Sequence, residues 1–231
     1  LSGNEISGTI SGTWIADQSP YLVVGDLQVN PYTSLTIDPG VEVVFMEDYQ
    51  LRVEGELHAV GTQQDSIYFR SDLPGESTWQ GINFQYSTAL SEISYADIQN
   101  TQGQAIKTYY SNPLTIIHSS FYDCDTRVLD FENTFAQITL SDLSITATNG
   151  WDGIYADESL LSLDNITISG DGGNGIYYRG NYQLSANNIN VQNFNRGFDF
   201  YNANNFNHVI TNSQITNNGD GIYINNGSSV A

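Results

Sequence analysis

The chain has 231 residues, 26 of them acidic and 6 basic, with a formal net charge of -20. This charge repels polyanions and excludes nucleic acid as a partner, and no apolar run approaches the roughly 20 residues of a membrane-spanning helix. The single cysteine, Cys124, excludes a framework of internal disulfides. Few cysteines with many Asn, Thr, Ser and Tyr residues are typical of secreted or cell-surface bacterial proteins, so we expect an extracellular location.

The first eighty residues predict short strands separated by glycine and proline turns. Apolar residues alternate within 21–25, 35–45 and 51–57. A coil of strands must cover its first open edge, and Trp14 and Tyr21 are suited to that task. We expect a single domain over 1–231, with an N-terminal cap and first turn in 1–45 and repeating turns of about 22–26 residues in 46–231.

From residue 81 onward, a four-residue phrase recurs: a small residue, an apolar residue, a variable residue, and another apolar or small one. The copies are Gly81-Ile82-Asn83-Phe84, Ala105-Ile106-Lys107-Thr108, Arg127-Val128-Leu129-Asp130 as a degenerate copy, Gly153-Ile154-Tyr155-Ala156, Gly175-Ile176-Tyr177-Tyr178, Gly197-Phe198-Asp199-Phe200 and Gly221-Ile222-Tyr223-Ile224. They are spaced about 22–26 residues apart, which is the period of a solenoid.

Each copy is followed by further strand-like segments. In the unit that begins at Gly175, residues 182–186 and 189–191 alternate apolar and polar side chains. Three short strands per turn, separated by Asn-Gly, Asp-Gly and Gly-Gly pairs, predict a triangular coil whose equivalent strands pair from turn to turn. No stretch has the 3.6-residue period of a helix, so the fold class is all-β.

The segments 19–21, 35–41, 57–62 and 67–71 resemble the N-terminal region of extracellular right-handed parallel β-helix proteins, and the later Gly-Ile copies resemble the repeats of the pectin-lyase-like superfamily. The resemblance implies a right-handed single-stranded parallel β-helix solenoid of about 8–9 turns, with an N-terminal cap and almost no helix. That superfamily includes pectate lyases, polygalacturonases, alginate epimerases, phage tailspikes and noncatalytic adhesins, so the fold leaves the function open.

The third residue of each phrase points outward, because neighbouring strand residues point to opposite faces. This outward column is predicted to run Asn83, Lys107, Leu129, Tyr155, Tyr177, Asp199, Tyr223. Two positions later a parallel column is predicted to run Gln85, Tyr109, Phe131, Asp157, Arg179, Tyr201, Asn225. We call the aromatic and acidic part the tyrosine patch and predict that it binds the ligand; it comprises Tyr155, Asp157, Tyr177, Arg179, Asp199, Tyr201 and Tyr223.

Three interpretations of the tyrosine patch stay open. Tyrosine rings stack on sugars, carboxylates accept hydrogen bonds from hydroxyls, and Arg179 could pair with a uronate carboxylate. A polysaccharide lyase would use Asp157, Arg179, Asp199 and Tyr201 to neutralise that carboxylate and remove the neighbouring proton. The plainest alternative is that the tyrosines and one Asp-Arg pair cover an exposed sheet.

The catalytic patterns of the superfamily are incomplete here. The polygalacturonase Asn-Thr-Asp stretch is matched by Asn133-Thr134-Phe135, which lacks the acid, and 170–172 has one Asp where that family has two. Pectate lyases bring several Asp residues to calcium beside Arg and Lys, whereas this chain has one Lys and scattered Asp residues. We expect no cofactor, with calcium as the one candidate, and the metal ligands stay unknown.

Asp152, Asn174 and Asp220 precede the repeat glycine and could bind calcium, although these residue types also favour turns, which we prefer. Cys124, beside Phe121, is interpreted as a small core residue.

The three histidines are predicted to lie on different turns, which disfavours a zinc site: His58, His118 and His208. An asparagine-rich segment is interpreted as corner residues that stack into amide ladders: Asn202, Asn204, Asn205, Asn207 and Asn212.

The leading prediction is a noncatalytic extracellular β-helix module that presents the tyrosine patch to a polysaccharide or to a neighbouring copy of itself. The rival is a polysaccharide lyase or epimerase acting on uronate-containing glycans. A third hypothesis is end-to-end assembly into a filament through the open strand edge of the last turn, 221–230. Neither nucleic acid nor membrane insertion is expected.

Overall fold

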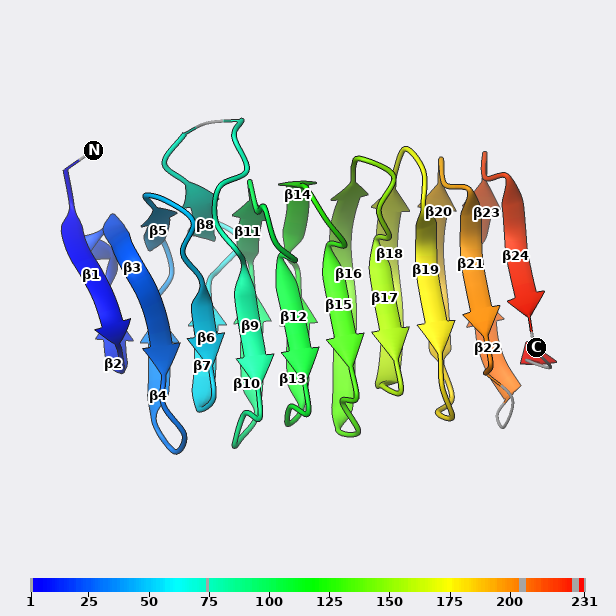
Figure 1. Cartoon of the computed structure of the whole chain (residues 1–231), viewed down its shortest axis with the longest axis horizontal. Helices are drawn as coiled ribbons and strands as arrows, with labels where there is room; N and C mark the ends of the chain where they lie inside the picture. The colour runs from blue at the N-terminus through cyan, green and yellow to red at the C-terminus, as the bar shows by residue number, and fades with distance from the viewer. Residues whose placement is uncertain (1, 74, 204–206, 226–228, 231) are drawn as a thin grey trace.

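The computed structural model describes residues 2–73, 75–203, 207–225 and 229–230. The chain winds into a parallel β-solenoid of about nine turns, drawn out along one axis from β1 to β24 (Figure 1). Within the described ranges, every pairing between strands is parallel. One 3-10 helix of three residues, η1 (Ala16–Gln18), is the only helix in the described part of the chain. The predicted all-β coil with almost no helix is confirmed.

Each turn contributes strands to three faces, which we name A, B and C. Face A stands toward the viewer in Figure 1. It consists of the C-terminal half of β3 (Tyr21–Val29), β6 (Leu51–Val53), β9 (Ile82–Gln85), β12 (Ile106–Tyr109), β15 (Leu129–Glu132), β17 (Ile154–Asp157), β19 (Asn174–Arg179), β21 (Arg196–Tyr201) and β24 (Asp220–Asn225).

Faces B and C complete the triangle. Face B consists of β2 (Gly12–Trp14), β4 (Ser34–Ile37), β7 (Glu56–Val60), β10 (Ser91–Ser94), β13 (Leu114–Ile117), the N-terminal halves of β16 (Gln137–Ala147), β18 (Leu160–Ser169) and β20 (Ser185–Gln192), then β22 (Asn207–Thr211) and β25 (Ser229–Val230). Face C consists of the N-terminal half of β1 (Asn4–Thr9), whose C-terminal half lies on face A, the N-terminal half of β3, β5 (Glu42–Phe45), β8 (Ile67–Ser71), β11 (Ala96–Gln99), β14 (Ser120–Cys124), the C-terminal halves of β16, β18 and β20, and β23 (Gln214–Thr216).

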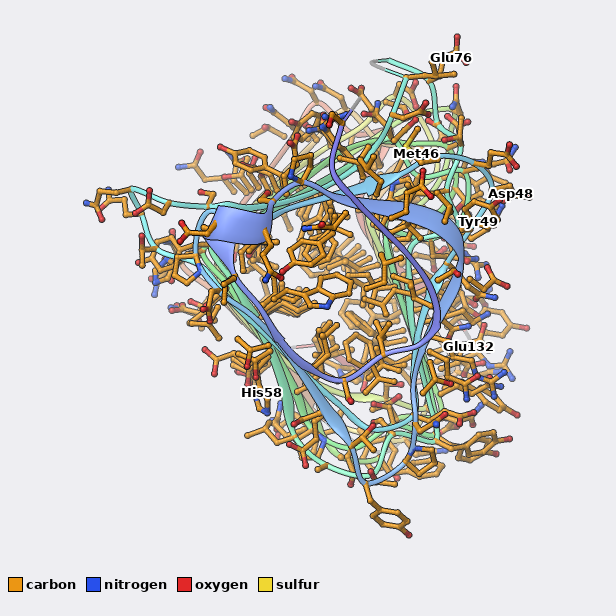
Figure 2. The ribbon with its side chains drawn as sticks, turned by 90° about the vertical axis from the view of Figure 1, so that its left-hand side faces the viewer. Met46, Asp48, Tyr49, His58, Glu76 and Glu132 are labelled. Atoms are coloured by element: carbon orange, nitrogen blue, oxygen red, sulfur yellow. The ribbon has the colours of Figure 1, made fainter. Side chains whose placement is uncertain are left out.

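The core is a column of inward side chains. Figure 2, which views the coil along its axis, shows rings filling the interior while Glu132 and His58 point outward on different sides. The indole of Trp79 is fully buried, stacks on Phe45 with 4.0 Å between ring centroids, and donates a hydrogen bond from Nε1 to the Gln99 carbonyl at 2.8 Å. Successive turns therefore share one continuous core, and each stabilises its neighbours.

Close packing explains the small residue that opens the repeat phrase. A Cβ atom at Gly175 would overlap Cγ1 of Val191 on face C and would lie 2.7 Å from the carbonyl oxygen of Gly197 in the next turn. Gly175 has no left-handed backbone angle. The glycine is required here by the approach of face C, not by backbone conformation.

The N-terminal region enters the coil earlier than expected. β1 already pairs in parallel with β3, from Asn4 opposite Tyr21 to Thr9 opposite Gln28. The segment 1–45, expected to hold the cap and first turn, thus holds the strands of more than one turn. Trp14 and Tyr21 are both buried there and stack with 4.6 Å between ring centroids.

Corner residues between faces B and C adopt left-handed backbone angles and bond from turn to turn. Asn188 Nδ2 donates to Asn165 Oδ1 at 2.8 Å, and both residues have positive φ. An amide ladder exists, but mainly outside the predicted asparagine run. Of that run, Asn202 and Asn212 are corner residues with φ of 52° and 53°, whereas Asn204 and Asn205 lie outside the described residues and Asn207 begins β22.

A buried histidine links the last turns. His208 packs between the rings of Tyr178 and Phe200, at 5.2 Å and 4.9 Å between centroids. Its Nδ1 accepts a hydrogen bond from the Leu184 amide at 3.1 Å, and its Nε2 lies 3.3 Å from the Ala203 carbonyl oxygen. This pattern fits the neutral ring protonated at Nε2. Burial lowers the pKa of His208 below 6.5, although the hydrogen bond to Ala203 acts in the opposite direction.

We expect the C-terminal turns to lose stability as pH falls below about 6.5, because the unfolded histidine binds a proton that the folded one resists. His208→Gln, which keeps an acceptor, should flatten this dependence. Thermal unfolding followed by circular dichroism between pH 7.5 and pH 5 measures the difference. Burial raises the pKa values of Asp130 and Asp157, whose protonation acts in the opposite sense, so the comparison with His208→Gln isolates the histidine. Parallel curves for the two proteins would contradict the assignment.

Candidate functional site

The register of face A confirms most of the predicted outward column and corrects one turn. In the strand register, Lys107 lies opposite Asp130, and Asp130 lies opposite Tyr155. Leu129 and Phe131, predicted to face outward, are fully buried. The degenerate copy therefore starts at Val128, one residue later than predicted, and the outward strand positions belong to Glu132 and to Asp130, whose side chain neighbouring groups cover to 1% exposure.

The structure brings the tyrosine patch together as the sequence predicts. Its members occupy four consecutive strands of face A, β17, β19, β21 and β24. One column pairs Tyr155, Tyr177, Asp199 and Tyr223, and the other pairs Asp157, Arg179 and Tyr201. In this geometry, however, the side chains of the patch contact one another and neighbouring protein groups.

Protein groups contact three tyrosine rings of the patch, those of Tyr155, Tyr177 and Tyr223. Tyr155 and Tyr177 stack at 4.9 Å between centroids with an interplanar angle of 6°. The Arg127 guanidinium lies 3.6 Å from the centroid of the Tyr155 ring, and the Arg196 guanidinium lies equally close to Tyr223. Tyr155 thus has partners for stacking and for a cation–π contact without a ligand.

The charged groups of the patch are also paired. Arg179 Nε lies 3.3 Å from Asp157 Oδ1, and Arg196 Nη1 lies 2.6 Å from Asp199 Oδ2. Burial, with the neighbouring Tyr155 and Asp199, raises the pKa of Tyr177 to about 12. Tyr177 is therefore protonated near neutral pH and is a poor general base.

Ion pairing extends to every basic residue of the chain. Beyond the patch, Arg52 pairs with Glu54, Arg70 Nε lies 2.6 Å from Glu42 Oε1, and Lys107 Nζ lies 3.6 Å from Glu132 Oε1. Arg127 Nη1 lies 3.3 Å from Asp130 Oδ2, and its Nε lies 3.5 Å from Asp152 Oδ2. All six cations of the sequence therefore have carboxylate partners.

A depression opens on the other half of face A, which we call the face A hollow. It encloses about 490 Å³, a volume typical of sites for small ligands. Its floor is formed by outward side chains of two neighbouring strands, Asn83 and Gln85 on β9 and Lys107 and Tyr109 on β12. The hollow is lined by Gln50, Gln80, Asn83, Gln85, Gln104, Lys107, Tyr109 and Glu132. Glu132 projects to solvent on this side (Figure 2).

Exposed rings border the hollow where face A turns into face B. We call Tyr86, Tyr110 and Phe135 the aromatic corner; their exposed fractions are 56%, 42% and 51%. The rings of Tyr86 and Tyr110 are parallel within 2°, with centroids 5.9 Å apart. Tyr109 in the hollow meets Tyr110 edge to face at 4.5 Å, and Phe135 continues the series 5.8 Å from Tyr110.

Two of these tyrosines occupy costly backbone positions. Tyr86 and Tyr110 have φ of 51° and 48°, in the left-handed region where bulky residues are rare. Among the equivalent corners after β15, β17, β19 and β21, three carry Asn133, Gly180 and Asn202, which accept such angles more easily, and the fourth carries Glu158 with φ of 47°. Backbone strain that a chain retains at exposed aromatic residues points to a role for the rings.

Neither the hollow nor the aromatic corner follows from the outward strand positions predicted from the sequence. Tyr109 appeared in the predicted second column, but Tyr86 and Tyr110 follow their strands and escape a search for outward strand positions. Aligning the residue after each strand would have shown aromatic side chains where asparagine or glycine is usual.

The other candidate residues from the sequence, which include the turn residues and Cys124, have partners within the protein. The backbone amide and Nδ2 of Asn174 both donate to Asp152 Oδ1 at 2.8 Å, while Asp220 lies 3.8 Å from Arg196. Cys124 is buried, and burial raises the pKa of its thiol to about 11, so it is unreactive near neutral pH. This confirms it as a core residue.

The histidines stand apart. His58 lies 3.2 Å from Glu56 on face B, His118 stacks on Tyr95 at a B–C corner, and His208 is buried near the last turn. Across the described residues, no group of three or more His, Cys, Asp or Glu side chains is placed to hold a metal ion.

Comparison with known proteins agrees with the architecture. Residues 76–231 match the family model of the right-handed beta helix region, more than half of the chain. No curated protein and no solved structure matches the chain. Within its described part, no helix has the length and apolar character needed to cross a membrane. Taken with the parallel register of its turns, the match shows that the chain belongs to the right-handed β-helix family.

Proposed function

We propose that this chain is a noncatalytic β-helix module of a secreted or cell-surface protein and that it binds carbohydrate on face A. The observation that carries the proposal is the face A hollow beside the aromatic corner. Amide and hydroxyl side chains line the hollow, and exposed rings stand at its edge. This combination of a few oriented polar groups and aromatic surface is suited to sugars, whose hydroxyls form hydrogen bonds and whose C–H faces pack on rings.

The hollow is a better centre for the site than the tyrosine patch. Both faces of the Tyr155 ring have protein partners, whereas Tyr86 and Phe135 each have about half of their surface exposed. The patch can still extend the site, because the row that contains Gln85, Tyr109 and Glu132 continues through Asp157, Arg179 and Tyr201. Adjacent turns are about 4.8 Å apart, close to the rise of one sugar in an extended glycan.

Pairing within the patch supports binding over catalysis. A uronate lyase needs a cationic group to neutralise the substrate carboxylate, and the guanidinium of Arg179 is paired with Asp157. It also needs a base, and both carboxylates of the candidate set are paired with guanidinium groups, Asp157 with Arg179 and Asp199 with Arg196. Release of unsaturated product from pectate or alginate, abolished by Arg179→Ala, would favour the lyase instead.

A glycan array tests the proposal directly. We expect wild-type protein to bind at least one class of glycan and Tyr109→Ala to lose most of that signal, by about tenfold, because Tyr109 supplies a ring and a hydroxyl inside the hollow. The matched control is Tyr68→Ala, an exposed tyrosine of β8 on face C, which should bind as wild type. An array without any bound glycan, or equal loss in both variants, would contradict the proposal.

End-to-end assembly is a second candidate function, favoured by one observation. Ile222 and Ile224 stand at inward positions of β24, yet they are 43% and 47% exposed. Such apolar ends could pair with β1 of a second copy. Sedimentation velocity over a hundredfold concentration range should then show species larger than the monomer, and Ile222→Lys should remove them. A monomer throughout that range would rule this candidate out.

A further inference from the structure

The charge distribution around the face A hollow restricts its ligand. Every cation of the chain is paired with a carboxylate, so no guanidinium or ammonium stands ready for a carboxylate on a polymer. Lys107, the cation that lines the hollow, lies 3.6 Å from Glu132, and its strand neighbour Asp130 is buried. With a net charge of -20 in addition, an approaching polyanion meets repulsion both at the hollow and over the whole molecule.

The lining of the hollow is rich in uncharged hydrogen-bonding groups. The side-chain amides of Gln50, Gln85 and Gln104 make no hydrogen bond to the described part of the chain. Gln80 Nε2 donates to Gln102 Oε1 at 3.0 Å at the edge of the hollow. Each amide offers both a donor and an acceptor, which matches the dual character of a sugar hydroxyl. A carboxylate only accepts and would leave the amide oxygens unpaired.

The aromatic corner adds a requirement for an apolar surface on the ligand. Tyr86 and Tyr110 present nearly parallel rings about one turn apart along the axis. Pyranose sugars with equatorial hydroxyls carry C–H faces that pack on such rings. Ring packing contributes affinity without any charge on the ligand.

We infer that the face A hollow takes an uncharged, hydroxyl-rich glycan and that Glu132 is a specificity-determining residue that disfavours uronates. The inference rests on the proposed carbohydrate binding and adds the class of ligand. Glu132 acts twice, since its carboxylate repels an acidic sugar and also holds the ammonium group of Lys107.

Matched pairs of oligosaccharides test the inference. The probes are β-1,4-linked mannan against mannuronan fragments of equal length, and carboxyl-reduced against native oligogalacturonate, each titrated calorimetrically into wild type and Glu132→Gln. We expect the neutral member of at least one pair to bind about tenfold or more tightly than its uronate partner at low salt. The affinity for the neutral oligosaccharide should change by no more than about twofold between 50 mM and 500 mM salt. Glu132→Gln should reduce the preference for the neutral oligosaccharide, because it should raise the affinity for the uronate partner several-fold.

The failures are distinguishable. If neither member of either pair binds and the array is also empty, the proposed carbohydrate binding falls. If a uronate member binds more tightly, weakens as salt is added, and is unaffected by Glu132→Gln, the inference alone is overturned and carbohydrate binding stands. Chitosan and chitin oligosaccharides of equal length serve as a third pair, and a preference for chitosan that is lost at high salt would overturn the inference in favour of a cationic glycan.

Discussion

Gly81→Ala is expected to destabilise the coil more than any other glycine-to-alanine change on face A. Gly81 has φ of 83°, and a Cβ atom there would overlap the backbone oxygen of Gln104 in the next turn. The backbone angle alone costs a non-glycine residue about 1–2 kcal/mol, and displacement of a paired backbone adds about 1–3 kcal/mol. Because Gln80 and Gln104 both line the face A hollow, glycan binding should fall together with the melting temperature.

Gly12→Ala is the matched control. Gly12 has φ of 87°, but no atom lies within 4 Å of the Cβ position. This variant carries the cost of the backbone angle without the overlap, so its melting temperature should fall clearly less. Thermal unfolding by circular dichroism, with both variants in the same buffer, measures the difference. Equal shifts for the two variants would show that close packing between turns does not explain Gly81.

The double change Tyr86→Asn and Tyr110→Asn should separate function from stability. Asparagine accepts the left-handed backbone that both tyrosines adopt, so the variant should unfold at the wild-type temperature or above it. Each lost ring removes about 1 kcal/mol of contact with a sugar, so glycan affinity should fall by about tenfold or more. Calorimetric titration and thermal unfolding of the same preparation measure both effects.

Tyr95→Asn provides the control for this prediction. Tyr95 also has a left-handed backbone, with φ of 47°, and stacks on His118 at the corner between faces B and C. The variant makes the same residue change at the same kind of corner, away from the aromatic corner, and should bind glycans as wild type does. If Tyr95→Asn weakens binding as much as the double variant, the aromatic corner is not part of the site.

The coil itself could be predicted because each turn repeats the same physical requirements. One position of successive turns carries Ile82, Ile106, Leu129, Ile154 and Ile176, and all five are buried. Left-handed corners select asparagine and glycine, which makes the turns visible in the sequence. Even the tyrosine patch follows from this regularity, since neighbouring turns bring its columns into register.

The predicted strand register is wrong in the turn that lacks the small residue. Because no glycine marks the start of the copy around Arg127, the predicted start lies one residue too early, and a shift of one residue exchanges the inward and outward faces. The alternation of Leu129 and Phe131 with Asp130 and Glu132 contains the correct register. Apolar alternation is therefore a better guide than the glycine in degenerate turns.

The face A hollow could not be predicted, because it depends on how side chains of unequal length pack on one face. Asn83 and Gln85 leave room that the Arg127 and Tyr155 pair fills a few turns away. Outward position alone does not tell an exposed ring from one that a neighbour covers. Tyr155 occupies an outward strand position in the sequence and Tyr86 does not, yet of the two only Tyr86 is mostly exposed.

A crystal structure with the best array glycan bound at saturation decides whether the face A hollow is the binding site. We expect density for sugar rings over β9 and β12, with hydroxyls near Gln85 and Gln104 and a ring face against Tyr109 or Tyr110. Sugar density confined to β17 and β19, over Tyr155 and Tyr177, would contradict it.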